Sequence, residues 1–124
     1  MNKTVLIVED DVDLLRIYKE ILDMEGFETH TAENGQEGIE KFKQTNPALT
    51  IMDGEMPIMN GYEAFKQIKI INKDANVVIV TGFSEFEVKN QDAIKAGLIK
   101  VISKPVGLQQ VIDLAQKYTE VEIK

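Results

Sequence analysis

Acidic, hydroxyl and lysine side chains follow directly after four apolar, mostly β-branched runs of this chain. Three acids follow residues 5–8, an aspartate follows residues 49–52, a threonine follows residues 77–80 and a lysine follows residues 101–103. Ligands bind at the carboxyl ends of strands in an open parallel α/β sheet, so we expect these side chains to meet in one crevice. Such a group suits the handling of a phosphoryl group and a divalent cation. The side chains concerned are Glu9, Asp10, Asp11, Asp53, Thr81 and Lys104.

The clustered carboxylates themselves favour a bound cation. Two unit charges about 4 Å apart repel by roughly 4 kcal/mol at an effective dielectric constant of about 20, so three converging acids are costly unless a cation joins them. The candidate ligands are all oxygen atoms, the chain has no cysteine, and its one histidine, His30, is far from them in sequence. Hard cations such as Mg²⁺ match a set of oxygen ligands and zinc does not, so we expect Mg²⁺.

Each of these residues also has an ordinary structural explanation. Asp10 or Asp11 could cap the helix that follows the first strand, because acids commonly begin helices. Thr81 could start a turn, and Lys104 could be a solvent-exposed lysine before a proline. Asp53 could be a turn residue, but it follows a buried strand, and a carboxylate there can attack phosphorus to form an acyl phosphate. The lysine and the cation would then neutralise charge, and the threonine hydroxyl would bond a phosphoryl oxygen.

Composition and charge exclude several classes of protein. The chain has 124 residues, of which 44% are hydrophobic, and this is typical of one globular domain spanning residues 1–124. Its net charge of −7 argues against nucleic acid or an anionic membrane surface as the main partner. No apolar stretch approaches the roughly 20 residues of a membrane span. The N-terminal residues do not have the pattern of a signal peptide, so we expect a cytoplasmic protein.

Apolar runs alternate with segments of helical period along the whole chain. Each helical segment ends near a glycine or proline or begins at a capping residue. The helix at 85–96 has the poorest apolar stripe of the five. Predicted strands are 4–8, 27–32 (at an edge), 49–52, 76–80 and 100–103; predicted helices are 12–25, a segment from Asn34-Gly35 to Pro47, a segment after Gly61, 85–96 and a final helix from Leu108.

Strict alternation of strands and helices, with near-continuous apolar strands, predicts an α/β fold with a parallel sheet covered by helices on both faces. Five strands in a chain of this length suit a doubly wound, flavodoxin-like sheet with the strand order 2-1-3-4-5. In that order the chain reverses direction between the first and third strands. Glu9-Asp10 and Asp53 end those two strands, so we expect the crevice to lie between them.

Four motifs in one order then identify a resemblance. They are Val-Leu-Ile-Val-Glu-Asp-Asp at 5–11, Asp-Gly-Glu-Met-Pro-Ile-Met-Asn-Gly at 53–61, Val-Thr-Gly at 80–82 and Ser-Lys-Pro at 103–105. With these motifs the chain resembles the receiver domain of two-component response regulators, the CheY-like fold, over residues 3–118. The resemblance implies that Asp53 is the phospho-acceptor. It also implies that Glu9, Asp10 and Asp53 hold Mg²⁺, with the backbone carbonyl of Glu55 as a further ligand.

The same resemblance implies a signalling role rather than turnover of an external substrate. Lys104 would pair with the acceptor or its phosphoryl group, and Thr81 would rotate inward to bond a phosphoryl oxygen. The peptide between Lys104 and Pro105 is usually cis in such domains. The phosphoryl donor would be a phosphohistidine on a sensor histidine kinase or a phosphotransfer protein, and the partner controlled would be a downstream effector protein or domain. The receiver would be a monomer or a weak dimer, with no direct nucleic-acid or membrane binding.

Two positions depart from the usual pattern of this family. Val101 stands three residues before the lysine, where such domains often carry Tyr, Phe or His as a rotating switch residue. Phe83, two residues after Thr81, occupies a position that is often polar in relatives. Conformational coupling from Thr81 toward the last strand therefore cannot use the common aromatic side chain.

Three other classes of protein share parts of this pattern. A Toprim-type nuclease places a glutamate after its first strand and an Asp-x-Asp pair after its third, which Glu9 and 53–55 imitate, but Lys104-Pro105 has no place in that scheme. A haloacid-dehalogenase-like phosphatase needs Asp-x-Asp after its first strand, and 9–11 does not supply it. A degenerate receiver used only for binding would not need an intact Asp53.

Overall fold

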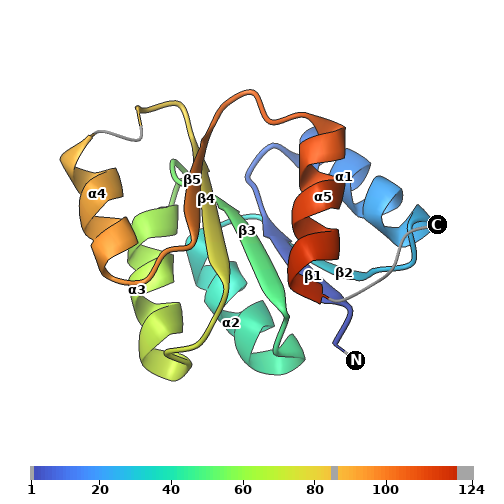
Figure 1. Cartoon of the computed structure of the whole chain (residues 1–124), viewed down its shortest axis with the longest axis horizontal. Coiled ribbons are helices and arrows are strands. Elements are labelled where there is room, and N and C mark those ends of the chain that lie inside the picture. Colours follow the sequence, from blue (N-terminus) through green and yellow to red (C-terminus); the bar gives the residue numbers. More distant parts are fainter. Residues whose placement is uncertain (1, 85–86, 120–124) are drawn as a thin grey trace.

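The computed structural model describes residues 2–84 and 87–119, and a five-stranded parallel sheet runs through its centre (Figure 1). The strand order is β2-β1-β3-β4-β5, as the alternation of strands and helices predicts. The sequence order therefore reverses between β1 and β3, which are hydrogen-bonded neighbours. The strands are β1 (Thr4–Val8), β2 (Glu28–Ala32), β3 (Leu49–Asp53), β4 (Val77–Thr81) and β5 (Lys100–Ser103).

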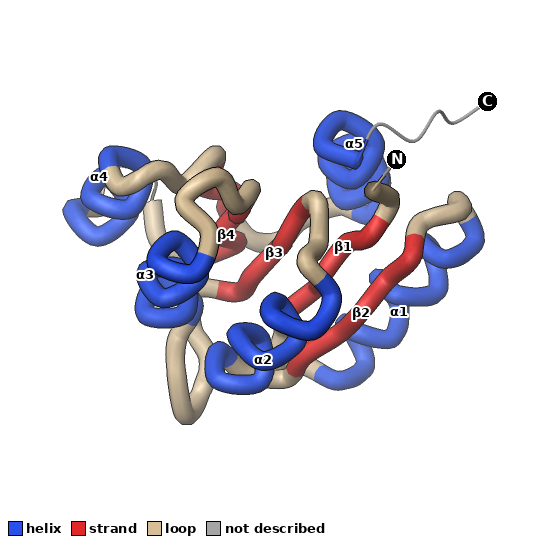
Figure 2. The backbone as a smooth tube through the Cα atoms, turned by 90° about the horizontal axis from the view of Figure 1, so that it is seen from below, coloured by secondary structure: helices blue, strands red, loops and turns tan. Residues whose placement is uncertain are grey.

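Helices cover both faces of the sheet. In the view of Figure 2, α2 and α3 lie on one face of the sheet, α1 and α5 lie on the other, and α4 stands beyond β4. Two apolar cores result, one between the sheet and α1 and α5, the other on the face that carries α2, α3 and the buried Ala93 of α4. The helices are α1 (Val12–Met24), α2 (Gly35–Thr45), α3 (Gly61–Ile71), α4 (Val88–Lys95) and α5 (Leu108–Thr119).

Alternating apolar side chains of β1 build the two cores. Val5 and Ile7 belong to the core beneath α1 and α5, whereas Leu6 and Val8 belong to the opposite core. Successive side chains of a strand point to opposite faces, so a strand covered on both sides must be apolar throughout. Every residue of β1, β3 and β4 is buried, and this explains why these three runs lack the apolar–polar alternation of a half-exposed strand.

The structure shifts several predicted boundaries by one to three residues. β3 and β4 each extend one residue further than predicted, so Asp53 and Thr81 are the last residues of their strands and pair in register with Val80 and Ser103. Because Asp53 and Thr81 are polar, strand bounds predicted from apolar runs stop one residue too early. Helix α4 begins at Val88 rather than 85; Glu85 and Phe86 lie outside the described residues.

Capping side chains fix where the helices begin. Asp11 is the N-cap of α1 and accepts hydrogen bonds from the backbone N–H groups of Asp13 and Leu14, so this acid has the structural role rather than the chemical one. Asn34 and Asn60 cap α2 and α3 in the same way. Within residues 2–84 and 87–119, no helix combines the length and apolar character that a membrane crossing requires.

The loop between β3 and α3 passes so close to the end of β3 that it needs a glycine. The N–H of Gly61 donates to the carbonyl oxygen of Gly54 at 3.0 Å. A Cβ atom at position 61 would collide with the backbone carbonyl of Asp53. The first residue of α3 thus holds the backbone beside the candidate acceptor in place.

We predict that Gly61→Ala lowers the free energy of unfolding by about 1–3 kcal/mol, the usual cost of forcing an extra group into a packed site. Urea denaturation measures the loss. Gln67→Ala, at an exposed position of the same helix, is the control and should change stability by less than about 0.5 kcal/mol. Equal effects of the two substitutions would contradict the close approach.

Candidate functional site

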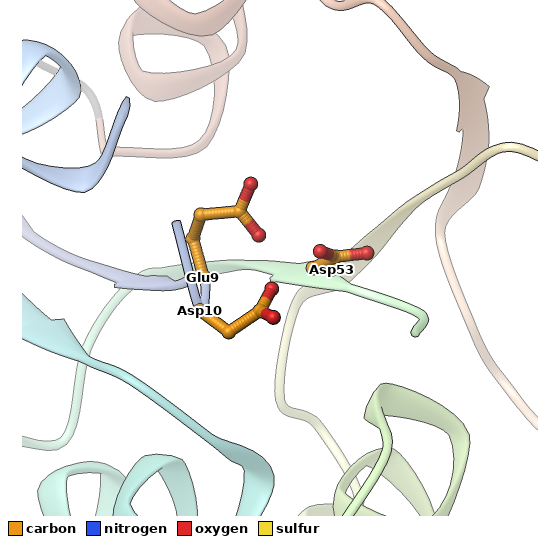
Figure 3. A group of neighbouring side chains, drawn as sticks. All are labelled: Glu9, Asp10 and Asp53. Carbon is orange, nitrogen blue, oxygen red and sulfur yellow. The ribbon is translucent and has the colours of Figure 1, made fainter. Parts of the chain in front are cut away.

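A cavity of about 480 Å³ opens at the carboxyl ends of β1 and β3, where the sequence predicts the crevice. Polar side chains occupy one part of its wall, and Leu14, Tyr18 and Val106 form an apolar part. Figure 3 shows the acids that meet there, two from the segment after β1 and one from the end of β3. The polar residues lining the cavity include Glu9, Asp10, Asp53, Glu55 and Lys104.

Three carboxylates form the centre of the site. One oxygen from each of Glu9, Asp10 and Asp53 lies within 4.8 Å of the others. Glu9 and Asp53 are 7% and 4% exposed, whereas Asp10 is exposed to solvent. The predicted convergence of Glu9, Asp10 and Asp53 is therefore present in the structure, and Asp11 is the acid that does not take part.

Two donors, Lys104 and the backbone N–H of Glu55, contact Oδ1 of Asp53. This oxygen lies 2.9 Å from Nζ of Lys104 and accepts a hydrogen bond from the backbone N–H of Glu55 at 3.1 Å. Burial alone raises the pKa of the Asp53 carboxyl. Hydrogen bonds with Glu9, Lys104 and the Glu55 N–H outweigh burial and bring this pKa below its ordinary value. The Asp53 side chain is thus kept as a carboxylate, the form a nucleophile requires.

The pKa of Glu9 is strongly raised in this arrangement. Burial, followed by the hydrogen bond and the charge of Asp53, raises the pKa of the Glu9 carboxyl from 4.5 to about 8. Its Oε2 atom is buried and has no hydrogen-bond partner. A buried carboxylate oxygen without a partner is unfavourable unless a ligand satisfies it.

The residues present fit a hard divalent cation. The donor set is three carboxylates with no nitrogen or sulfur atom, and one of its oxygens is buried and unpartnered. Burial is the main cause of the raised pKa of Glu9, and a cation of charge +2 would offset the repulsion from Asp53 and Asp10 that adds to it. Mg²⁺ binds through a few carboxylates and keeps several waters, which suits a cluster that is open at Asp10. The expected ligation by the Glu55 backbone carbonyl stays a prediction.

Lys104 is positioned by the end of β5. Its backbone N–H donates to the carbonyl oxygen of Thr81 at 2.9 Å, which ties it to β4, and the Lys104-Pro105 peptide is cis, as the resemblance implies. Burial lowers the pKa of the Lys104 ammonium, but its hydrogen bond to Asp53 and the surrounding carboxylates raise it above the ordinary value. The lysine therefore stays charged beside Asp53.

The Thr81 hydroxyl is already engaged. Thr81 is fully buried and donates to Oε2 of Glu55 at 2.7 Å, while the backbone N–H of Phe83 donates to the threonine oxygen at 3.1 Å. The other Glu55 oxygen accepts the N–H of Gly82 at 3.1 Å. The structure thus brings Thr81 to the same end of the sheet as Asp53, with its hydroxyl bonded to Glu55.

Sequence reasoning missed three side chains around Thr81. The sequence does not reveal that the Glu55 carboxylate bonds both the Thr81 hydroxyl and the N–H of Gly82. Tyr62 and Asn90 were not singled out, yet the Tyr62 hydroxyl donates to Oδ1 of the fully buried Asn90. One signal was available, because an asparagine in a buried position of α4 explains the poor apolar stripe of that helix.

Together, the strand order and the acid cluster at the reversal between β1 and β3 define a doubly wound domain of the CheY-like class. A model of the response regulator receiver domain family matches residues 5–116. The chain therefore belongs to the receiver domain family of two-component response regulators, which confirms the resemblance and does not favour the Toprim-type hypothesis.

Relatives match this chain over most of its length. It is 37% identical over 113 residues to the chemotaxis protein CheY of Halobacterium salinarum, covering 91% of this chain and 93% of that protein. A CheY-like receiver domain protein from Methanospirillum hungatei superposes with a TM-score of 0.87 at 28% identity, covering 97% and 95% of the two chains. The response regulator TrrA of Thermotoga maritima, solved in complex with Mg²⁺ and BeF, gives a TM-score of 0.80 at 31% identity, covering 94% and 98%.

The raised pKa of Glu9 predicts a pH dependence of stability without metal. Between the ordinary value of 4.5 and about 8, the folded protein keeps the Glu9 proton and the unfolded chain loses it, so stability falls as pH rises through this window. A full proton of difference corresponds to about 1.4 kcal/mol per pH unit. Urea denaturation in EDTA at several pH values measures this slope.

Glu9→Gln is the matched variant, because glutamine keeps the size and a hydrogen-bonding group but does not titrate. We expect a flatter dependence of the unfolding free energy on pH in this variant than in the wild type. Identical slopes in the two proteins would show that Glu9 ionises in the folded state at its ordinary pKa.

Proposed function

We propose that this chain is a single phospho-accepting receiver domain, residues 1–124, in which Asp53 takes a phosphoryl group and the resulting change in conformation controls a partner. One observation carries the proposal: the buried carboxylate of Asp53 lies 2.9 Å from the ammonium of Lys104 and within 4.8 Å of the carboxylates of Glu9 and Asp10. A nucleophile, a cation for the transferred group and a set of metal ligands are thereby in one crevice.

The reaction is a substitution at phosphorus. A carboxylate oxygen of Asp53 forms a bond to phosphorus while the bond from phosphorus to the donor breaks; for a phosphohistidine donor this is a phosphorus–nitrogen bond, and the imidazole leaves with the electron pair and takes up a proton. The low pKa of Asp53 supplies the charged nucleophile, and Lys104 offsets negative charge on the phosphoryl oxygens.

Glu9, Asp10 and Asp53 would hold Mg²⁺ at this site. When bound, the cation supplies charge that neutralises phosphoryl oxygens in phosphoryl transfer. The exposed position of Asp10 leaves the cluster open to a phosphodonor, and the unpartnered Oε2 of Glu9 gains a partner. The complex of TrrA with Mg²⁺ and BeF supports the assignment by similarity.

Thr81 would report the phosphorylated state. Its hydroxyl donates to Glu55 in this structure, so it must leave that carboxylate before it can donate to a phosphoryl oxygen at Asp53. The exchange would replace one charge-assisted hydrogen bond by another.

The partners follow from the same chemistry. The donor would be a sensor histidine kinase or a phosphotransfer protein, and the output would pass to a downstream effector protein or domain. The net charge of −7 does not favour direct nucleic-acid or membrane binding, and we propose a cytoplasmic monomer or weak dimer. Its role is that of a signalling phospho-acceptor that promotes its own phosphorylation and dephosphorylation.

Acetyl phosphate with Mg²⁺ should add one phosphoryl group to the protein, as measured by intact mass. Asp53→Asn keeps the size of the side chain but removes the nucleophile, so the added mass should disappear. Asp113→Asn, at an exposed position of α5, is the control and should be modified like the wild type. An adduct of equal yield in Asp53→Asn would refute the assignment.

Release of Thr81 from Glu55 should favour the state with an occupied site. We expect Glu55→Ala to raise the affinity for beryllium fluoride at saturating Mg²⁺ by up to about tenfold, or about 1.4 kcal/mol, near the net value of one hydrogen bond. Isothermal titration calorimetry measures it. Glu63→Ala removes a carboxylate that lines the neighbouring cavity without touching Thr81, and it should leave the affinity unchanged. Weaker binding by Glu55→Ala would contradict the competition for the hydroxyl.

A further inference from the structure

Tyr62, near the start of α3, packs against the residue that follows the candidate acceptor. A Cβ atom at Gly54 would lie 2.9 Å from Cε2 of Tyr62 and 3.2 Å from its hydroxyl oxygen. The absence of a side chain at position 54 is therefore what allows the tyrosine ring and hydroxyl to lie beside the end of β3. Tyr62 also lines a second cavity of about 560 Å³ together with Glu55 and Phe83.

The Tyr62 hydroxyl has contacts on both sides. Toward α4 it donates to Oδ1 of Asn90. Toward the sheet, burial raises the pKa of Tyr62 more than a hydrogen bond with the Thr81 side chain lowers it, so the phenol stays protonated and remains a hydrogen-bond donor. Thr81 also accepts the backbone N–H of Phe83 at 3.1 Å, and Phe83 lines the same cavity as Tyr62. The Tyr62 hydroxyl therefore lies between Thr81, which would sense phosphorylation, and helix α4.

Asn90 is central to the attachment of α4. Only Asn90 and Ala93 of this helix are buried, and its N-cap Glu87 makes no side-chain capping bond. The amide of Asn90 is fully buried, accepts from Tyr62 and donates to the carbonyl oxygen of Ser84 at 2.6 Å. A buried amide needs these partners. A change at either of them should therefore alter the position of Asn90 and, with it, of this short helix.

β5 does not offer a comparable polar connection. Val101, which precedes Lys104 by three residues, is 8% exposed and belongs to the apolar core that includes Ala93 and Leu98. An aliphatic side chain cannot form a hydrogen bond to Thr81 or to α4. Near Thr81, Tyr62 bonds α4 through Asn90, and Nζ of Lys89 in the same helix lies 3.5 Å from the centre of the Phe83 ring and 5.2 Å from that of Tyr62.

We propose that Tyr62 and Asn90 form a hydrogen-bonded relay that couples the state of the Thr81 hydroxyl to the position of α4. The relay rests on the proposed function, since it responds when Thr81 turns from Glu55 to a phosphoryl oxygen. That movement changes the surroundings of the Tyr62 hydroxyl, and through it the position of Asn90 and of the Ser84 carbonyl that Asn90 holds. Tyr62 is thus a positioning residue of the switch, without contact with the reacting atoms.

Backbone amide chemical shifts of the full chain, recorded with and without Mg²⁺ and beryllium fluoride at saturation, test the relay. Three proteins are compared: the wild type, Tyr62→Phe, which removes only the hydroxyl, and Tyr118→Phe, which removes the hydroxyl of a half-buried tyrosine on α5. Two groups of amides are followed, those of the site (Asp53, Thr81 and Lys104) and those of α4 (Val88–Lys95).

The relay predicts that all three proteins show shift changes at the site, and that the changes in α4 fall about twofold or more in Tyr62→Phe alone. Changes in α4 that are the same in Tyr62→Phe and the wild type would overturn the relay and leave the backbone from Thr81 to Ser84 as the route. Changes at the site of the wild type without changes in α4 would also overturn it, while the proposed function stands. Absence of site changes in the wild type would instead refute the proposed function.

Discussion

The closeness of Glu9 and Asp53 is the constraint on which the rest of the site depends. Strands β1 and β3 are hydrogen-bonded neighbours that are buried along their whole length, so the residues at their ends are brought together by the apolar cores and not by mutual attraction. Burying two acids side by side is unfavourable. The structure offsets part of this cost by placing the Lys104 ammonium against Asp53, and burial together with the nearby Asp53 raises the pKa of Glu9.

This unfavourable closeness also explains what the site can bind. In the proposed function, a dication would give the unpartnered Glu9 oxygen a partner, and a phosphoryl group would meet a lysine that already carries a charge. Around this centre, a second set of polar groups is fully satisfied: Thr81 bonds Glu55, and Asn90 bonds Tyr62 and the Ser84 carbonyl. The acid cluster has an oxygen without a hydrogen-bond partner, whereas the groups around Thr81 are already bonded and would have to exchange partners on phosphorylation.

The sequence predicts the sheet order and the acid cluster because both follow from position along the chain. A mostly apolar run of four residues followed by an acid predicts a buried strand with the acid at its carboxyl end, and the alternation of elements leaves few topologies. Glu9, Asp10 and Asp53 lie together as this argument requires. Position along the chain leaves both Asp10 and Asp11 open as the helix cap, and in the structure Asp11 is the N-cap of α1.

The connections around Thr81 could not be predicted in the same way. Glu55, Tyr62 and Asn90 come from a loop and two helices, and their contacts depend on how those elements pack rather than on periodicity. Gly54 shows the difficulty, because its importance lies in the space it leaves for Tyr62 and not in any chemistry of its own. The poor apolar pattern of α4 is consistent with Asn90, a polar residue at a buried position of this helix.

A crystal structure of the protein with Mg²⁺ and beryllium fluoride would reveal most directly whether Asp53 is the acceptor in a magnesium site. We expect a beryllium atom bonded to a carboxylate oxygen of Asp53, a fluorine atom close to Nζ of Lys104, and a magnesium ion ligated by the carboxylates of this cluster, with the Thr81 hydroxyl released from Glu55. Beryllium fluoride bound to another carboxylate, or a metal ion held away from Glu9, Asp10 and Asp53, would contradict this assignment.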